Sequence, residues 1–510
     1  MQKITIYVKF TIKKTIAQKI FLIYNLACKK GEECVMAKYI NEKLQEFERY
    51  IRNKKVAIIG LGVSNLPLLD YFSDKGADVT VFDKRTIDEI DKTILDKITS
   101  RCIHFSFGEH YLINLVGFDI IFRSPTCRPD TPELKAEILR GAIVTSEIEM
   151  VVELCPGKVI GITGSDGKTT TTSLIYEIVK EKGYDCYLGG NIGIPLFTKI
   201  KDMTPETIVI LELSSFQLMD MQTCPEISVV TNVSPNHLDV HKSYEEYIEC
   251  KKKIFKNQTE KGIVVLNYDN DVTRYFASEA NGKVIFFSRK NKLDNGVIYD
   301  NGVIKSCEDG VRRHIITIDD AVSLRGMHNY ENMCAAIAAT STLVEPSIQA
   351  RAITKFKGVE HRLEYVRTIN GVKWYNDSIG TSPTRTIAGL NAFDKKIVLI
   401  AGGYDKKLDY KPIAKPIIDK VSDLILMGAT ADKIQTAVEE QLKVNGVDDN
   451  NHALPIYRCN TLEEAVNKAY EVANSNEIVL FSPASASFDM YKNFMERGEK
   501  FKELVRNIEE

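Results

Sequence analysis

The chain has 510 residues, of which 44% are hydrophobic and 27% are charged, and its formal net charge is −2. Such values are ordinary for a soluble globular protein, and this length predicts roughly three domains. The near-neutral charge shows no sign of a nucleic-acid or anionic-membrane surface, and no apolar run is long enough to span a bilayer. We therefore expect neither nucleic acid nor a membrane among its partners.

The eleven cysteines lie far apart in the sequence. They form no C-x-x-C pair and no Cys/His spacing that is typical of a zinc site. We therefore expect free thiols in a reducing compartment.

Residues 1–35 are basic and only patchily apolar. They contain no sustained apolar region or small-residue cleavage site, so a secretory signal is not expected. Two interpretations stay open. The segment is an N-terminal extension, or Met36 is the natural start, because codons for Lys29–Glu33 can spell a ribosome-binding sequence. N-terminal sequencing of the native protein would distinguish them.

The first α/β pattern extends from residue 41 to residue 83 and reads helix, strand, tight turn, helix, strand. The turn contains Gly60 and Gly62, and the second strand ends at Asp83. An acid about 20 residues after the first glycine is typical of half a Rossmann unit. Asn65 stands where the fingerprint has its third glycine, so NAD binding is only weakly indicated. A nucleotide-sugar site and a purely structural turn remain alternatives.

A glycine-rich segment, Gly161–Thr170, stands between an apolar run and a helical pattern. Strand, glycine-rich turn and helix form the context of a phosphate-binding loop, in which N–H groups at the helix start bind phosphate oxygens. Lys168 adds a positive charge, and Thr169 adds a hydroxyl that can bind Mg²⁺. The glycines follow a three-residue spacing, and Ile162 stands where the Walker A pattern has its first glycine. We predict ATP binding.

Two further expected strands lead into polar residues. The first contains Glu212 at its end, and the second is followed by His237. A carboxylate beside the phosphate loop could hold Mg²⁺, although an isolated Glu at a strand end is more often solvated. His237 could be an ordinary hydrogen-bonded loop residue, but its position one strand beyond Glu212 favours a role near the metal.

Strand and helix patterns continue to alternate to the C-terminus, with one hairpin expected around Asn301 and Gly302. Alternation of this kind implies mostly parallel sheets with helices on both faces. We predict an α/β fold with three domains. The predicted boundaries are 36–154, 155–356 and 357–510.

The phosphate loop, the Leu-Ser-Ser-Phe-Gln-Leu segment at 213–218 and the Ser-Pro-Ala-Ser-Ala-Ser-Phe-Asp segment at 482–489 together resemble the Mur ligase family. The resemblance covers about residues 36–510, and the last two segments are most similar to the D-glutamate-adding members. It implies a Rossmann-like domain for the UDP substrate, a central P-loop ATPase-like domain, and a Rossmann-like C-terminal domain that binds the amino acid and closes on ATP.

The implied activity is an ATP-dependent, ADP-forming ligation of D-glutamate to UDP-N-acetylmuramoyl-L-alanine through an acyl phosphate. The implied setting is cytoplasmic peptidoglycan precursor synthesis by a monomer that uses ATP and two Mg²⁺ ions. Folylpolyglutamate synthetases share the loop chemistry but lack the first nucleotide-binding unit, and other Mur ligases differ in the amino acid that they add. A NAD-dependent dehydrogenase and a non-catalytic ATP-binding regulator fit the motifs less well.

The resemblance also implies roles for single residues. The catalytic residues would be Lys168, Glu212, His237 and Lys251. The metal ligands would be Thr169, Glu212, His237 and Lys251, the last as a carbamate formed with CO₂. ATP would be bound by Gly164, Ser165, Asp166, Gly167, Lys168, Thr169, Thr170, Asn329, Asn332, Arg362 and Asp377. The UDP substrate would be bound by Gly60, Gly62, Val63, Ser64, Asn65, Asp83, Lys84, Arg85 and Asn191. D-Glutamate would be bound by Thr381, Lys406, Ser487 and Phe494.

Three departures from the family pattern affect these expectations. Relatives commonly carry a lysine at the position of Ile379, and we expect Arg385 or Lys407 to supply the missing positive charge. Asn236 replaces an acid that many relatives have before the histidine, which would weaken the support of the metal site. The segment 124–129 matches the family's Ser-Pro-Gly loop only in part. Without the resemblance, Lys251 would be interpreted as part of a solvated lysine run on a helix.

Overall fold

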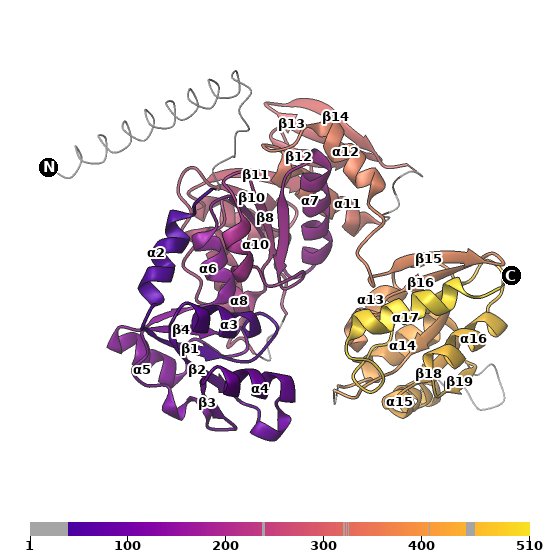
Figure 1. Cartoon of the computed structure of the whole chain (residues 1–510). Coiled ribbons are helices and arrows are strands. Elements are labelled where there is room, and N and C mark those ends of the chain that lie inside the picture. Colours follow the sequence, from indigo (N-terminus) through magenta and orange to yellow (C-terminus); the bar gives the residue numbers. More distant parts are fainter. Residues whose placement is uncertain are drawn as a thin grey trace, which may run out of the picture. The chain divides into compact units, whose positions relative to one another are not determined.

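The computed structural model describes residues 39–236, 240–319, 322, 324, 326–406, 408–444 and 454–509 (Figure 1). The two interpretations of residues 1–35 concern a segment outside these residues. The chain divides into two compact units between Tyr50 and Ile51. Helix α2 (Glu42–Ile51), expected from the sequence, accounts for most of the described part of the first unit.

The first sheet has five parallel strands in the order β3-β2-β1-β4-β5. Its centre is β1, where residues 56–59 are all buried, as the apolar run predicts. The expected strand, turn, helix and strand are confirmed. The strands are β1 (Lys55–Ile59), β2 (Asp78–Asp83), β3 (His104–Phe107), β4 (Ile120–Arg123) and β5 (Ile143–Thr145), and the helices are α3 (Leu66–Asp74), α4 (Lys92–Ser100), α5 (Pro132–Arg140) and α6 (Glu147–Leu154).

The second sheet has nine strands in the order β14-β13-β12-β11-β10-β9-β6-β8-β7. The hairpin between β12 and β13 is confirmed, and both turn residues, Asn301 and Gly302, have positive φ. The antiparallel edge strand β14 was not anticipated. The strands are β6 (Lys158–Thr163), β7 (Cys186–Gly190), β8 (Ile208–Glu212), β9 (Ile227–Val230), β10 (Ile263–Asn267), β11 (Lys283–Ser288), β12 (Gly296–Asp300), β13 (Val303–Glu308) and β14 (Val311–Thr317).

Helices α7 (Lys168–Lys182) and α11 (Met327–Thr340) lie side by side in this region (Figure 1). The run of small buried residues at 335–339 in α11 allows close approach, and α7 contributes Leu174, Ile175 and Ile178 to the same core. The remaining helices here are α8 (Ser215–Leu218), α9 (Tyr244–Lys256), α10 (Asp271–Phe276) and α12 (Pro346–Lys355).

The third sheet has six strands in the order β15-β16-β20-β17-β18-β19, and only the edge strand β15 is antiparallel to its neighbour. Two separate cores lie on its faces: one includes residues of α14 and α15, and the other includes residues of α16 and α17. The strands are β15 (Glu364–Ile369), β16 (Val372–Asn376), β17 (Ile397–Ala401), β18 (Val421–Met427), β19 (Ile456–Cys459) and β20 (Ile478–Phe481). The helices are α13 (Pro383–Leu390), α14 (Lys411–Lys420), α15 (Ala431–Val444), α16 (Leu462–Val472) and α17 (Phe494–Arg506).

The predicted α/β class with mostly parallel sheets is thus confirmed. Parallel strands carry their loops to one edge of each sheet, and most of the predicted site residues lie in such loops. Every cysteine within the described ranges is a free thiol. Among the helices that the structure describes, none is long and apolar enough to cross a membrane.

Candidate functional site

The glycine-rich loop leaves β6 and enters α7 at Gly167. Gly164 has φ +149° and Gly167 has φ +79°. A Cβ atom on Gly164 would lie 1.9 Å from Thr231 Oγ1, and one on Gly167 would lie 2.3 Å from Asn332 Oδ1. Neither position therefore accepts a side chain. No side chain caps the start of α7, so the N-terminus of this helix keeps the character of an anion-binding site.

The loop is held by residues that follow β9 and by one residue of α9. Thr231 Oγ1 donates to the Asp166 carbonyl oxygen at 2.6 Å, and the Asp166 N–H donates to Asn232 Oδ1 at 2.9 Å. The Ser165 hydroxyl lies 2.9 Å from the hydroxyl of Tyr247. Sequence analysis did not single out these three supporting residues. Their position after an apolar strand, or on the helix of Lys251, was the available signal.

Two lysines meet at one carbonyl oxygen of the loop. Lys168 Nζ donates to Gly164 O at 3.0 Å and to Ser165 O at 2.9 Å, and Lys251 Nζ donates to Gly164 O at 2.7 Å. Lys251 is 1% exposed, so it does not belong to a solvated lysine run. Burial, followed by the positive charge of Lys168, holds the pKa of Lys251 well below its usual value. Burial also lowers the pKa of Lys168.

Glu212, the last residue of β8, is 1% exposed and therefore not a solvated strand end. Its Oε1 accepts a hydrogen bond from Asn191 Nδ2 at 2.9 Å, whereas its Oε2 has no hydrogen-bond partner among the described residues. A buried carboxylate oxygen without a partner is costly, and oxygen ligands of this kind suit Mg²⁺. The buried, unpartnered Oε2 of Glu212 therefore fits a ligand of a divalent cation. His237 lies outside the described residues.

The two asparagines predicted to bind ATP lie on α11, next to the phosphate loop. Asn332 is buried, donates to Asn329 Oδ1 at 3.3 Å, and accepts a hydrogen bond from Thr171 at 3.4 Å. The closeness of Asn332 Oδ1 to Gly167 brings both residues to the start of α7. The structure thus brings the predicted ATP residues of the second sheet together.

Asp377 follows β16 and is buried. Its Oδ1 accepts a hydrogen bond from the Leu363 N–H at 3.2 Å, and its Oδ2 accepts one from Ser482 at 2.6 Å. Burial raises the pKa of Asp377 to about 6, while these hydrogen bonds and the charges of Arg362 and Arg385 act in the opposite direction. Both oxygens are therefore engaged within the chain, and Asp377 holds the segment that carries Arg362. The charges of both arginines also contribute to lowering the pKa of Lys168.

The loops that carry two of the predicted D-glutamate residues, Thr381 and Ser487, are connected by a residue the sequence did not reveal. Arg497 of α17 is completely buried and donates to the carbonyl oxygens of Ala486 at 2.8 Å, Ser485 at 3.1 Å and Ser378 at 2.9 Å. Burial lowers the pKa of Arg497 to about 10. The loops after β16 and β20 are thereby fixed to each other.

Of the four residues predicted to contact D-glutamate, Thr381 and Ser487 lie in these two loops, whereas Lys406 follows β17 and Phe494 begins α17. Ser487 is buried, and the partly exposed Phe494 accepts a hydrogen bond from Ser378 Oγ through its carbonyl oxygen at 2.7 Å. Thr381 lies just before α13, and the pKa of Lys406 is lowered by burial and then by the charges of Arg497 and Arg385.

Arg385 is exposed, and its guanidinium has no hydrogen-bond or ion-pair partner in the described part of the chain. Lys407, the alternative source of the missing charge, lies outside the described residues.

In the first sheet, Asn65, which stands at the position of the third fingerprint glycine, stabilises the turn with its side chain. Its side-chain amide donates to the carbonyl oxygens of Ile59 and Gly60 at 3.0 Å and closes the turn. Asp83 accepts a hydrogen bond from the Leu61 N–H at 2.7 Å and pairs with Arg85. The predicted UDP-substrate residues at the tip of the turn, Gly62, Val63 and Ser64, and the neighbouring Lys84, remain exposed or partly exposed.

Three family models match the chain in sequence order. They describe a Mur ligase MurD-like N-terminal domain at residues 54–146, a Mur ligase middle domain at 162–340, and a Mur ligase glutamate ligase domain at 361–485.

Two relatives carry the name UDP-N-acetylmuramoylalanine–D-glutamate ligase. The protein of Acetivibrio thermocellus is 51% identical over 471 residues, and that of Ruminiclostridium cellulolyticum is 48% identical over 469 residues. Each comparison covers 92% of this chain and 100% of the relative.

Solved structures of lower identity are similar in fold. UDP-N-acetylmuramate-alanine ligase MurC of Thermotoga maritima is 18% identical, with a TM-score of 0.53 over 89% of this chain and 99% of that one. MurF ligase of Thermotoga maritima, solved with ADP, is 16% identical, with a TM-score of 0.51 over 94% and 100%.

Gly190 offers a test of how the Glu212 region is built. It has φ +93°, and an added Cβ would lie 2.2 Å from the carbonyl oxygen of Glu212. Gly183 has the same φ, but an added Cβ there meets nothing within 4 Å. Both alanine variants carry left-handed strain of about 1–2 kcal/mol, and only Gly190→Ala adds the clash. We expect Gly190→Ala to weaken binding of a non-hydrolysable ATP analogue with Mg²⁺ in calorimetry, and Gly183→Ala to bind normally. Equal affinities for the two variants would contradict this account.

Proposed function

This chain belongs to the Mur ligase family, and we propose that it joins D-glutamate to UDP-N-acetylmuramoyl-L-alanine with conversion of ATP to ADP and phosphate. One structural observation carries the proposal: Lys168, Lys251 and the unpartnered oxygen of Glu212 surround a glycine loop at a helix N-terminus. Relatives at 51% and 48% identity, named for this reaction, support the choice of substrates. The proposed place of action is the cytoplasm.

The proposed chemistry follows from the low reactivity of a carboxylate toward amines. Transfer of the γ-phosphoryl group of ATP to the alanyl carboxylate makes an acyl phosphate and ADP. The neutral amine of D-glutamate attacks the carbonyl carbon and forms a C–N bond. Phosphate then leaves with the electrons of the C–O bond, and the nitrogen loses a proton. The protein's contribution is positioning and charge neutralisation.

Each part of the chain has a proposed task in this reaction. Lys168 and the N–H groups at the start of α7 bind the phosphates, and Arg362 adds charge from the third sheet. Mg²⁺ ions, when bound by Glu212, Thr169, His237 and the carbamate of Lys251, would neutralise the charge of the phosphate oxygens. The residue sets predicted for the UDP substrate and for D-glutamate keep the tasks that the resemblance implies.

The function is tested by phosphate release from purified protein with ATP, Mg²⁺ and UDP-N-acetylmuramoyl-L-alanine, with D-glutamate, L-glutamate and other amino acids offered separately. We expect release only with D-glutamate, and a product of the matching mass. Lys168→Ala should lower kcat by roughly 100- to 1000-fold, because a transition-state donor is lost. Lys180→Ala, which changes an exposed lysine of the same helix, should be neutral.

Other outcomes of this assay would change the function assigned to the chain. Release with a different amino acid would keep the ligase reaction and make the chain a sister ligase. No release with any amino acid, in a protein that binds ATP, would favour the non-catalytic regulator. Normal activity of Lys168→Ala would remove the proposed role of the loop.

We further propose that CO₂ modifies Lys251. Burial beside Lys168 favours the uncharged amine, which is the form that adds to CO₂ to give a carbamate and a proton. With ¹³C-bicarbonate, we expect a carbamate carbon signal in the NMR spectrum of the wild type. The signal should be absent from Lys251→Ala and present in Lys256→Ala, which changes an exposed lysine of the same helix. A signal that persists in Lys251→Ala would place the modification elsewhere.

Arg385 is proposed to supply the positive charge that Ile379 lacks. It is exposed in the first turn of α13, and its charge reaches Asp377, Lys168 and Lys406. We expect Arg385→Ala to raise KM for D-glutamate or to lower kcat about tenfold, because one charge-assisted hydrogen bond is lost. Arg458→Ala, which removes only exposed contacts with Asp432 and Gln435, is the matched control. Unchanged kinetics in Arg385→Ala would end this proposal, and a loss of D-glutamate use in Lys407→Ala instead would assign the charge to the alternative residue.

A further inference from the structure

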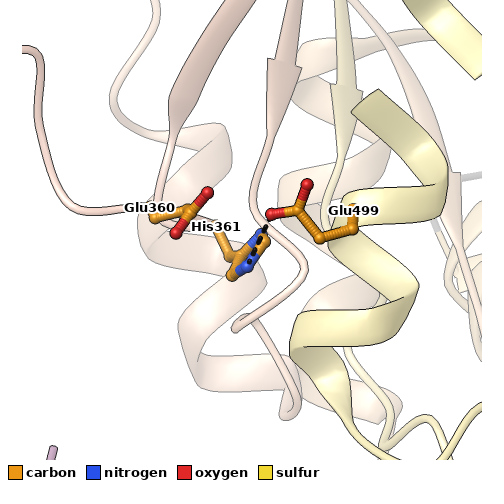
Figure 2. A group of neighbouring side chains, drawn as sticks. All are labelled: Glu360, His361 and Glu499. Atoms are coloured by element: carbon orange, nitrogen blue, oxygen red, sulfur yellow. Dashed lines mark ion pairs between the residues drawn. The ribbon is translucent and has the colours of Figure 1, made fainter. Parts of the chain in front are cut away.

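A cluster of charged residues joins helix α17 to the segment before β15. Figure 2 shows Glu360, His361 and Glu499 pointing toward one another, and their ligand-type atoms all lie within 4.8 Å of one another. Such a group resembles a metal site, but Lys502 already provides its positive charge. Lys502 Nζ pairs with Glu499 at 2.8 Å and with Glu360, and its side chain is only 4% exposed. The cluster therefore has a built-in cation.

The same segment contains a strained turn around Arg362. His361 has φ +61° and Leu363 has φ +44°. Left-handed backbone at residues other than glycine costs about 1–2 kcal/mol each and persists only where the surroundings hold it. Because these two residues flank Arg362, the direction of its guanidinium depends on whether the turn is maintained.

Glu364 closes this turn. Its Oε2 accepts hydrogen bonds from the His361 N–H at 2.8 Å and from Asn376 Nδ2 at 3.0 Å. Its other oxygen, Oε1, pairs with Lys502 at 3.2 Å. One carboxylate thus connects Lys502 to the backbone of the residue before Arg362.

Lys502 also stops three carboxylates from repelling one another. Glu360, Glu364 and Glu499 all pair with its ammonium group. The hydrogen bond and charge of Lys502 hold the pKa of Glu360 below its usual value. Gly498 allows the close approach of helix and turn, because a Cβ there would lie 2.3 Å from His361 Nδ1. Without Lys502, the turn would face a concentration of negative charge and lose its anchor to α17.

We propose that Lys502 is a positioning residue that holds the strained turn around Arg362 through Glu364 and Glu360, and thereby sets the affinity for the nucleotide. The proposal rests on the proposed function only in assigning Arg362 to ATP. Lys502 itself touches no reacting atom in this scheme. Its effect falls mainly on nucleotide binding, because Arg497 holds the loops after β16 and β20, although the turn also touches this region where the Ile379 N–H donates to the His361 carbonyl oxygen and the His361 ring contacts Phe494.

The test compares Lys502→Met, Lys502→Arg and Lys500→Met in the full chain. Lys500 is a partly exposed lysine of the same helix that pairs only with Glu503 within the described chain, which makes it the matched control. Calorimetry with ADP and Mg²⁺ gives Kd, and steady-state kinetics give KM for ATP and for D-glutamate. We expect Lys502→Met to raise Kd for ADP and KM for ATP about tenfold, which corresponds to one hydrogen-bonded charge contact. KM for D-glutamate should change less than twofold, Lys502→Arg should recover most of the affinity, and Lys500→Met should match the wild type.

Two results would overturn the proposal. One is a folded Lys502→Met protein with wild-type Kd for ADP. The other is an equal rise in KM for both substrates, which indicates a general loss of structure. If Lys502→Met does not fold, Glu360→Gln replaces it, because Glu360 is exposed and glutamine has nearly the same shape as glutamate. Glu360→Gln should weaken ADP binding about threefold. An unchanged Kd for ADP in this variant rejects the proposal.

Failure of this proposal and failure of the proposed function are distinguishable. ADP binding does not depend on which amino acid the enzyme adds. If the wild-type protein binds ADP but does not use D-glutamate, the proposed function is rejected. The role of Lys502 is then still decided by the Kd for ADP of the Lys502 variants.

Discussion

The carbonyl oxygen of Gly164 accepts hydrogen bonds from two lysine ammonium groups, those of Lys168 and Lys251. This shared acceptor depends on the unusual φ of Gly164 and on Thr231, which occupies the space that a side chain at Gly164 would need. Burial disfavours the charged form of Lys251, and repulsion between the two positive charges on one oxygen adds to this cost, so the pKa of Lys251 is driven down. The arrangement favours a site that receives negative charge, as a phosphate loop does.

The third sheet uses buried cations in a related way. Arg497 satisfies carbonyl oxygens of the loops after β16 and β20, and Lys502 gathers the carboxylates around the Arg362 turn. Both residues lie on α17, on one of the two faces of the sheet. A single helix therefore organises the segments predicted to contact D-glutamate and the turn predicted to contact ATP. Removing Arg497 would leave buried carbonyl oxygens without partners, which is more costly than losing an exposed ion pair. Removing Lys502 would leave three neighbouring carboxylates without their shared cation.

Local patterns in the sequence predicted the architecture well. The strand, glycine-rich turn and helix around Gly164 and Gly167, the hairpin at Asn301, and the alternation of strands and helices all appear in the structure. The edge strand β14 was missed, because five of its seven residues are exposed and polar or charged positions interrupt the apolar pattern. The tight turn at Gly60 was predicted, but a pattern of residue types does not show that the amide of Asn65 closes it.

By itself the sequence determined which segments become strands, helices and tight turns, and which residue types stand at strand ends. Such features depend on neighbours within a few positions, through backbone geometry and the period of apolar residues. Only the tertiary structure decided that Lys251 is buried against a loop 87 positions away, that Glu212 keeps an unpartnered oxygen, and that Asp377 binds the turn at Leu363 with one oxygen and Ser482 with the other. Burial and long-range hydrogen bonds arise when distant segments pack together, and no local pattern encodes which partner a side chain will meet.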